Sequence, residues 1–362
     1  MLVTIIVRLG FTRACGSSLL ASLLLCCFYA AAQAQSGVGK NIDEVTKLAM
    51  KEGKVRMASS FQPDEEDLVL KAFKQKYPMI KVEHTLQIGG TDTRQRILTE
   101  AIGGVVEYDL VDVVAEMRKE YLKSGVLAGP FNWRQLFPKV AEIHFSPDGY
   151  FAGVAYGFHV FAYNPTLVPP ERVPKRWDDC LDPYWKGKFV VDTRARIFAN
   201  LSRAWGEEKT IKYVTALKNN QPIWKRSPSE ILPSVVAGEF PMVCGTFYQT
   251  AKRILRRDPN AKLAVSIPTE VSTGIIETLG IMKGSKNPNA ALLLAGWLAS
   301  PEGQKGYDEI GKGSPFAEGS EKWELVKKAG AKVVFGGWDE SEYIPPITRK
   351  IHAAWGFTTA PK

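Results

Sequence analysis

The stretch KVRMASSFQPDEEDLVLKAFKQKYPMIKVEHTL (54–86) carries the pattern that decides the fold. Its opening residues, Lys54–Ser59, predict a strand, and Pro63 followed by four acidic residues predicts a helix start. Apolar residues then recur at helical spacing until Pro78 ends the helix, and Lys81–Leu86 alternates polar and apolar residues. The stretch therefore predicts a strand, a helix and a second strand.

The segments that follow extend this unit into a parallel sheet. Asp92–Ile102 has apolar residues on one helical face, and Asp109–Ala115 (DLVDVVA) is the nearly continuous apolar run of a buried parallel strand. Strands that alternate with helices in this way form an α/β sheet covered by helices. Ligands of such sheets lie beyond the carboxyl ends of the strands, so we expect a site there.

A second αβ lobe is predicted further along the chain. Phe151–Tyr163 predicts an extended segment, Lys188–Asp192 a strand followed by helices, and Pro241–Gly245 a short strand that runs into a helix. The chain then returns toward the first lobe, so at least two crossings form a hinge. The expected bounds are 41–150 plus about 267–312 for the first lobe, and about 151–266 plus 313–362 for the second.

Residues 1–34 predict a cleavable secretion signal. Two arginines precede an apolar stretch that ends in the small-residue triplet Ala32-Gln33-Ala34, after which a signal peptidase can cut. Leu25 stands before Cys26, where lipid attachment would require a small residue, so we expect a soluble periplasmic product. A permanent membrane anchor is the alternative, which the short apolar core disfavours.

Charge and motifs argue against two classes of function, nucleic-acid binding and enzymatic catalysis. The chain has 47 Lys and Arg against 38 Asp and Glu, a net charge of +9, which falls to +7 without the two arginines of the leader. This excess forms no dense basic block, so we expect no nucleic-acid partner. The sequence contains no G-x-S-x-G, H-E-x-x-H or phosphate-loop motif, so we expect no enzyme.

Cysteine usage excludes a disulfide framework. Three of the five cysteines lie in the predicted leader, so only Cys180 and Cys244 remain. We expect these two to be buried free thiols, with a disulfide between them as the alternative. Two cysteines cannot form a zinc site of the paired-cysteine kind.

Six segments, in this order and spacing, carry a family resemblance: KEGKVRMASS (51–60), LKAFKQKYPMIKVE (70–83), TRQRILTEAIGG (93–104), FAYNPTLVPPERVPKRWDDCLDPYWKGKFVVD (161–192), VVAGEF (235–240) and KGSKNPNAALLLAGWLASPEGQ (283–304). Together they resemble the iron(III)/polyamine-type solute-binding proteins of ABC importers. The resemblance implies a type 2 periplasmic-binding fold, with two lobes and hinge strands between them. It also implies capture of a small solute in the interlobe cleft and delivery to an inner-membrane permease driven by an ATPase.

The candidates for the ligand site are residues at the ends of the predicted strands and aromatic residues near the hinge, which can form an apolar wall. They are Ser59, Ser60, Gln62, Gly90, Thr91 and Glu116 in the first lobe, and Tyr156, Arg194, Thr246, Phe247 and Tyr248 in the hinge and second lobe. Thr91 and Thr246 stand at helix starts, where free N–H groups favour an anion, and Arg194 can clamp a carboxylate or phosphonate. Open alternatives are helix capping by the threonines and an ion pair of Arg194 with Asp192 or Asp182. We expect a small anionic or organic solute.

Ferric iron is the alternative ligand. Family members that bind it use two adjacent tyrosines, often with a His and a Glu, whereas this chain has Phe247-Tyr248, and Gln62 lies near the histidine position. The resemblance leaves only Tyr248 and Glu116 as metal ligands, so a synergistic anion would complete the coordination. We expect a monomer without a resident cofactor; a polyamine solute, a sensor domain or a periplasmic enzyme on the same fold are further alternatives.

Overall fold

The computed structural model describes residues 37–87 and 91–357. The predicted leader and Gly90 lie outside this part of the chain, and so does the side chain of Thr91. From Gly39 onward the described residues form one compact unit. None of the helices within the described residues has the length and apolar character that a membrane span requires.

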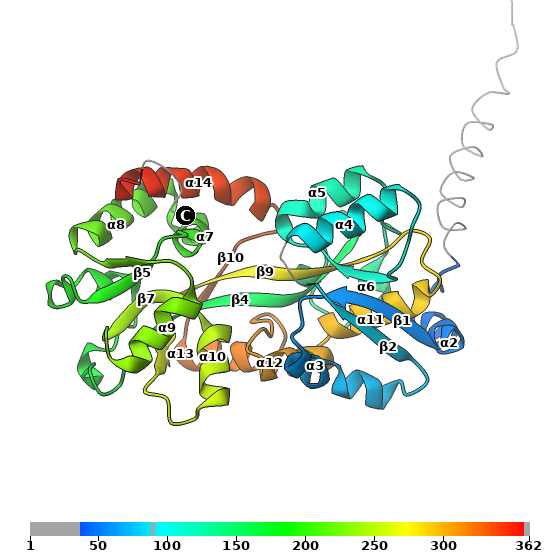
Figure 1. Ribbon diagram of the computed structural model, residues 1–362, viewed down its shortest axis with the longest axis horizontal. Helices are drawn as coiled ribbons and strands as arrows, with labels where there is room; N and C mark the ends of the chain where they lie inside the picture. The colour runs from blue at the N-terminus through cyan, green and yellow to red at the C-terminus, as the bar shows by residue number, and fades with distance from the viewer. Residues whose placement is uncertain (1–36, 88–90, 358–362) are drawn as a thin grey trace, which may run out of the picture. The chain divides into compact units, whose positions relative to one another are not determined.

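The strand–helix alternation predicted for the first lobe is confirmed (Figure 1). Its elements are α2 (Ile42–Glu52), β1 (Lys54–Ser59), α3 (Pro63–Lys76), β2 (Lys81–Leu86), α4 (Thr91–Ile102), β3 (Leu110–Asp112), α5 (Ala115–Lys123), α6 (Trp133–Leu136) and η1 (Glu142–His144). Strand β1 pairs in parallel with both β2 and β3. The carboxyl ends of these strands therefore lie at one edge, as the pattern predicts.

The second lobe has the same kind of alternation. Its elements are β4 (Phe151–Tyr163), η2 (Pro170–Arg172), η3 (Trp177–Leu181), η4 (Pro183–Trp185), β5 (Phe189–Asp192), α7 (Arg196–Trp205), α8 (Glu207–Asn219), β6 (Ile223–Lys225), α9 (Pro228–Ala237), β7 (Met242–Phe247), α10 (Tyr248–Arg257) and β8 (Ala264–Ser266). Strand β5 pairs in parallel with β6 and β7. The short strand predicted at 241–245 is β7, and it runs directly into α10.

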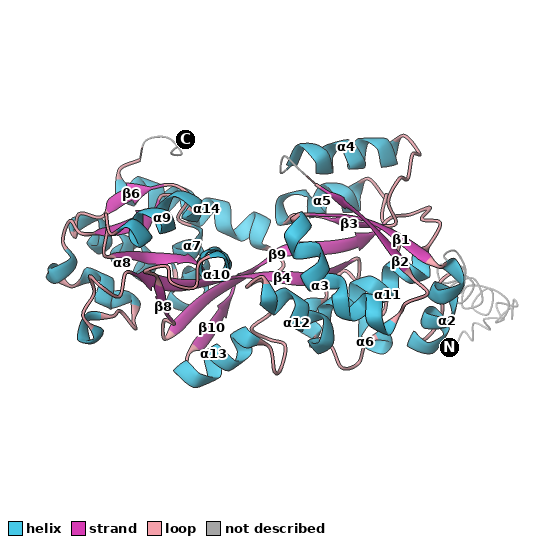
Figure 2. Cartoon of the chain, turned by 60° about the horizontal axis from the view of Figure 1, so that its bottom comes forward, coloured by secondary structure: helices cyan, strands magenta, loops and turns pink. Residues whose placement is uncertain are grey.

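Strands β4 and β9 (Glu270–Ile281) join the two lobes. They pair antiparallel over most of their length, and both views show them running side by side between the lobes (Figures 1 and 2). Among the described residues the strands form one sheet of order β2-β1-β3-β9-β4-β7-β5-β6. The lobe bounds themselves stay a prediction.

The carboxyl-terminal elements return to both lobes. They are α11 (Pro288–Ala299), α12 (Pro301–Glu309), α13 (Glu321–Ala329), β10 (Lys332–Phe335) and α14 (Glu340–Trp355). Helix α11 is buried almost all round, as its apolar sequence predicts. Strand β10 pairs with β9, and α14 packs on α7 and α8 and also touches α5.

The expectation of two free thiols is wrong, because Cys180 and Cys244 form a disulfide with Cα atoms 6.2 Å apart. Cys180 lies in η3 and Cys244 on β7, and both are buried in one core with Trp177 and Phe198. The two cysteines are 64 residues apart in sequence. Only the packing of η3 on the second-lobe sheet brings them within bonding distance, and no local pattern encodes that contact.

Removing the disulfide by Cys180→Ala and Cys244→Ala together should lower the free energy of unfolding. Closing a loop of this length restricts the unfolded chain, which corresponds to about 4 kcal/mol. Urea unfolding of the oxidised wild type and the double variant measures the difference, and the wild type kept in reductant serves as a control. Equal midpoints for all three samples would show that the bond adds no stability.

Asp109 ties β1 to the start of α11. Its carboxylate accepts hydrogen bonds from the backbone N–H and side chain of Arg56, at 2.7 to 3.0 Å, and from Ser285 (2.8 Å) and Asn287 (3.0 Å). Burial alone would raise the pKa of Asp109, but the bonds from Arg56, Asn287 and Ser285 lower it to about 2. The ionised carboxylate is thus the form that the fold stabilises.

Asp109→Asn should destabilise the protein by about 2 kcal/mol at neutral pH, which follows from a pKa lowered from 3.8 to about 2. A lowered folded-state pKa contributes stability above the unfolded value and loses it on acidification. The difference in free energy of unfolding between wild type and variant should therefore become smaller as the pH falls from about 4 to about 2. Denaturant unfolding at both ends of this range tests it; a gap that does not change with pH would contradict it.

Candidate functional site

A cavity of about 370 Å³ lies where three helices begin beside the hinge strand β9. The first lobe contributes Val114, Ala115 and Glu116 to its wall, and α14 contributes Ile344 and Thr348. The remaining wall comes from the second lobe and β9: Asp192, Arg194, Ala195, Arg196, Ile197, Phe198, Cys244, Gly245, Phe247, Ile275 and Ile276. This volume is in the range of small-molecule sites.

Three residues of the wall immediately precede a helix. Val114 is the N-cap of α5, Ala195 of α7 and Phe247 of α10. Valine, alanine and phenylalanine have no side-chain oxygen, so none of them can bond the N–H groups of its helix's first turn as a Ser or Asp would. Three sets of first-turn N–H groups therefore begin at this cavity, and such groups attract negative charge.

Both arginines of the wall have carboxylate partners within the protein. Arg194 donates to Asp192 from Nε (3.0 and 3.1 Å) and Nη2 (2.5 Å). The ion pair with Asp192, left open as an alternative by the sequence, is therefore present. Arg196 pairs with Glu340 at 2.7 Å and with Glu116 at 3.6 Å. The arginines are held in place, and their charges are balanced locally.

Apolar side chains make up much of the rest of the wall. Phe247 packs against the ring of His159, with ring centroids 4.4 Å apart, and against Gly157 of β4. A Cβ at Gly157 would lie 3.0 Å from the Phe247 ring, so glycine is what lets the ring approach the strand. Ile276 has no paired residue on β4, because the β4–β9 register shifts at this point. Such a bulge redirects side chains, and here both Ile275 and Ile276 face the cavity.

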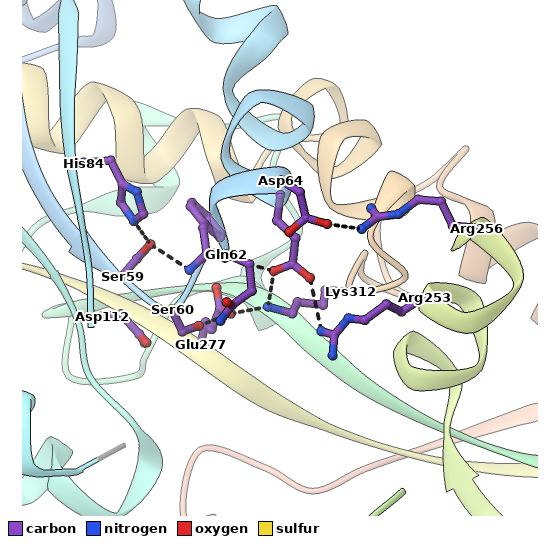
Figure 3. A network of polar contacts seen from close by, with 12 residues as sticks. Ser59, Ser60, Gln62, Asp64, His84, Asp112, Arg253, Arg256, Glu277 and Lys312 are labelled. Atoms are coloured by element: carbon purple, nitrogen blue, oxygen red, sulfur yellow. Dashed lines mark hydrogen bonds and ion pairs between the residues drawn. The ribbon is translucent and has the colours of Figure 1, made fainter. Parts of the chain in front are cut away.

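The predicted residues at the end of β1 lie in a polar network (Figure 3). The hydroxyl of Ser59 is 2.9 Å from Nε2 of His84, and Ser60 donates to Glu277 at 2.5 Å. The backbone N–H of Gln62 bonds the Glu65 carboxylate at 3.3 Å. These three residues are not among those that line the cavity.

The same network joins α3 of the first lobe to α10 of the second. Arg253 pairs with Glu65 at 3.1 Å, and Arg256 with Asp64 at 3.0 Å. Lys312 lies between Glu65 (3.5 Å) and Glu277 (2.9 Å) (Figure 3). The sequence analysis missed Glu277, Lys312 and Arg253, because charges so far apart along the chain give no local signal.

Three further predicted residues are buried close to the cavity or the hinge. Tyr156 is fully buried on β4, and burial raises its pKa well above the usual value. Thr246 is buried on β7. The hydroxyl of Tyr248 donates to Glu321 at 2.9 Å, and burial together with this carboxylate raises its pKa. Tyr248 therefore keeps its proton at neutral pH. It is also not among the residues that line the cavity.

The structure thus brings together three of the predicted site residues, Glu116, Arg194 and Phe247, at one cavity. Of the two predicted metal ligands, Glu116 lies in the wall and Tyr248 does not. No cluster of three or more His, Cys, Asp or Glu side chains suited to a metal ion occurs in residues 37–87 and 91–357. The two carboxylates of the wall, Asp192 and Glu116, pair with Arg194 and Arg196.

Tyr248→Phe should lower the free energy of unfolding by about 1 kcal/mol and leave solute affinity unchanged. The substitution removes one hydrogen bond to Glu321, which keeps Lys252 at 2.6 Å as a partner. Thermal unfolding and a binding titration of the same two proteins provide the measurement. A loss of binding without a loss of stability would instead place the phenol at the ligand.

Comparisons with known proteins add the family context. Residues 58–305 match the family model described as bacterial extracellular solute-binding protein. An Fe(3+)-binding periplasmic protein of Serratia marcescens is 24% identical over 176 residues, which cover 43% of this chain and 48% of that protein. The matched stretch thus spans less than half of the curated relatives.

Solved structures share the fold. A Trichodesmium protein in complex with iron and citrate aligns with a TM-score of 0.63 and 20% identity, over 84% of this chain and 98% of that one. The spermidine/putrescine ABC transporter substrate-binding protein of Streptococcus pneumoniae aligns with a TM-score of 0.57 and 16% identity, over 83% and 99%. At these identities the likeness concerns the two-lobed fold.

Proposed function

The chain belongs to the family of bacterial extracellular solute-binding proteins, and on this premise we propose that its cavity captures a small organic anion for an ABC importer. The exported protein would act in the periplasm as a monomer and present its solute to an inner-membrane permease coupled to an ATPase. Transport, rather than catalysis, is the role that this family membership supports.

The observation that carries the anion is the convergence of three helix starts on one cavity. Each start contributes first-turn N–H groups that its N-cap side chain does not bond, together with the positive end of a helix dipole. An anion bound there would accept hydrogen bonds from backbone groups that no neighbouring side chain caps. Arg194 and Arg196 lie in the same wall, but carboxylates balance their charges, so the helix starts supply the net positive field.

The apolar residues of the cavity wall favour an organic solute. Phe198, Phe247, Ile275, Ile276 and Ile344 offer apolar surface, which a bare inorganic ion would leave uncovered. A solute that carries a carboxylate, phosphonate or sulfonate on a small apolar body matches both parts of the cavity. Burial of that body supplies most of the affinity, and the helix starts fix its orientation.

Ferric iron accompanied by an anion is the second candidate. The names of the Serratia marcescens relative and of the Trichodesmium structure, which holds iron and citrate, favour it. In this chain the cavity wall offers Glu116 and Asp192 as carboxylates, and the Tyr248 hydroxyl is engaged with Glu321. Most of the oxygen ligands that ferric iron prefers would therefore have to come from the accompanying anion.

Placing a carboxylate at an uncapped helix start tests the proposal. In Val114→Asp the new side chain would cap α5 and occupy its N–H groups, so anion affinity should fall by about tenfold or more. A panel of carboxylates, phosphonates, sulfonates and ferric citrate, read by thermal shift and calorimetry, identifies the solute in the wild type. Mass spectrometry of the material that co-purifies with the protein narrows the panel.

Val105→Asp provides the matched control, because Val105 is exposed on the first lobe and is not part of the cavity wall. It introduces the same charge and should leave the affinity as in the wild type. Equal affinity in all three proteins, or no anion bound by the wild type, would refute the proposed site. A visible charge-transfer band with ferric citrate, lost in Tyr248→Phe, would favour the iron alternative.

A further inference from the structure

The carboxylate of Glu340 lies behind the arginine side of the cavity. Glu340 is the first residue of α14, is 2% exposed, and pairs with Arg196 at 2.7 Å. Burial raises its pKa, while the positive charges of Arg196 and Arg118 act in the opposite direction. A charged group buried to this degree persists only where its surroundings are built to hold it.

Two glycines make the space for this carboxylate. A Cβ at Gly274 of β9 would overlap Oε1 of Glu340, and a Cβ at Gly336, just after β10, would lie 2.6 Å from the same atom. Neither glycine has a positive φ, so the backbone conformation does not require glycine at either position. Glycine at these two positions instead leaves room for the Glu340 carboxylate. Buried Asn200 of α7 closes the same space.

Arg118 brings a second guanidinium to this place from the first lobe. It lies on α5, is 6% exposed, and stacks on Trp338 with 4.9 Å between the guanidinium carbon and the ring centroid. Within residues 37–87 and 91–357, neither terminal nitrogen of Arg118 has a hydrogen-bond partner. The charges of Glu340 and Glu116 act on it. A buried guanidinium whose terminal N–H groups have no hydrogen-bond partner can bind a negatively charged group.

The four charged residues of the cavity wall, Arg194, Arg196, Asp192 and Glu116, have a formal sum of zero. Behind the wall, the negative charge of Glu340 acts on both Arg196 and Arg118. The helix starts then supply the remaining positive field, which amounts to about half an elementary charge each. A field of this size suits a solute with one negative charge. A second negative charge on the solute would be repelled by the Glu340 carboxylate on the far side of Arg196.

We infer that Glu340 is a specificity-determining residue: it places a fixed negative charge against Arg196, just behind the cavity wall, and so restricts the solute to a single negative charge. This inference rests on the proposed function and names its solute class, singly charged organic anions. Without this carboxylate, Arg196 would keep only its longer pair with Glu116 (3.6 Å) and could interact more strongly with a second negative charge on the solute. The discrimination arises from repulsion of the wrong ligand as much as from attraction of the right one.

The test compares two probes that share a sulfur–oxygen head and differ in charge. Methanesulfonate carries one negative charge and sulfate carries two, and neither titrates near neutral pH. In Glu340→Gln the affinity for sulfate relative to methanesulfonate should rise by about tenfold or more over the wild type. Glu340→Ala should also raise the relative affinity for sulfate. Because alanine has no amide, this result would show that the change does not come from a new contact of the glutamine side chain. Thermal unfolding checks that each variant is folded.

Glu342→Gln is the matched control, since Glu342 is on the same helix turn, is exposed, and pairs with Lys119 at 2.6 Å. It makes the same charge change and should leave the ratio of the two affinities as in the wild type. The inference would be overturned if the wild type binds methanesulfonate and both folded variants, Glu340→Gln and Glu340→Ala, keep its ratio of sulfate to methanesulfonate affinity. The proposed function would survive that result. If the wild type binds no carboxylate, phosphonate or sulfonate, the proposed function fails and the inference falls with it.

Discussion

Two long strands, β4 and β9, hold both lobes and the cavity in register through one antiparallel ladder. It runs from the pair Phe151 and Gly280 to the pair Phe158 and Thr273. Nearly every residue of both strands is buried, so their backbone polar groups depend on neighbouring strands for most of their hydrogen bonds. Residues of β9 then serve three separate sites. Ile275 and Ile276 line the cavity, Glu277 belongs to the polar network, and Gly274 leaves space for Glu340.

Ion pairs connect the lobes on both sides of this ladder, and they differ in burial. Arg253 and Lys312 meet the buried Glu65 in the polar network, whereas Lys119 and Glu342 form an exposed pair. Exposed pairs contribute little stability because water and salt screen them. Buried pairs carry a desolvation cost and favour one arrangement of the groups that form them. The network beside α3 and α10 therefore fixes how the lobes meet more than the surface pairs do.

Sequence patterns were sufficient for most elements of each lobe and for three residues of the candidate cavity. The period of apolar residues and the prolines placed β1, α3 and β2, because these signals depend on neighbours a few residues away. The rule that ligands lie beyond parallel strand ends selected Glu116, Arg194 and Phe247, which the structure brings to one cavity. The same rule also selected Ser59, Ser60 and Tyr248, whose hydrogen bonds are made elsewhere.

The sequence by itself determined the alternation of strands and helices along the chain, the two αβ lobes and the family, since periodicity and local turns are properties of short segments. Tertiary structure alone decided that Cys180 meets Cys244, and that Glu340 reaches Arg196 from 144 residues away. It also decided which of the residues at the strand ends point into the cavity. Such contacts depend on register shifts and on how distant helices pack, and a one-residue change in either redirects a side chain without altering the pattern that the sequence displays.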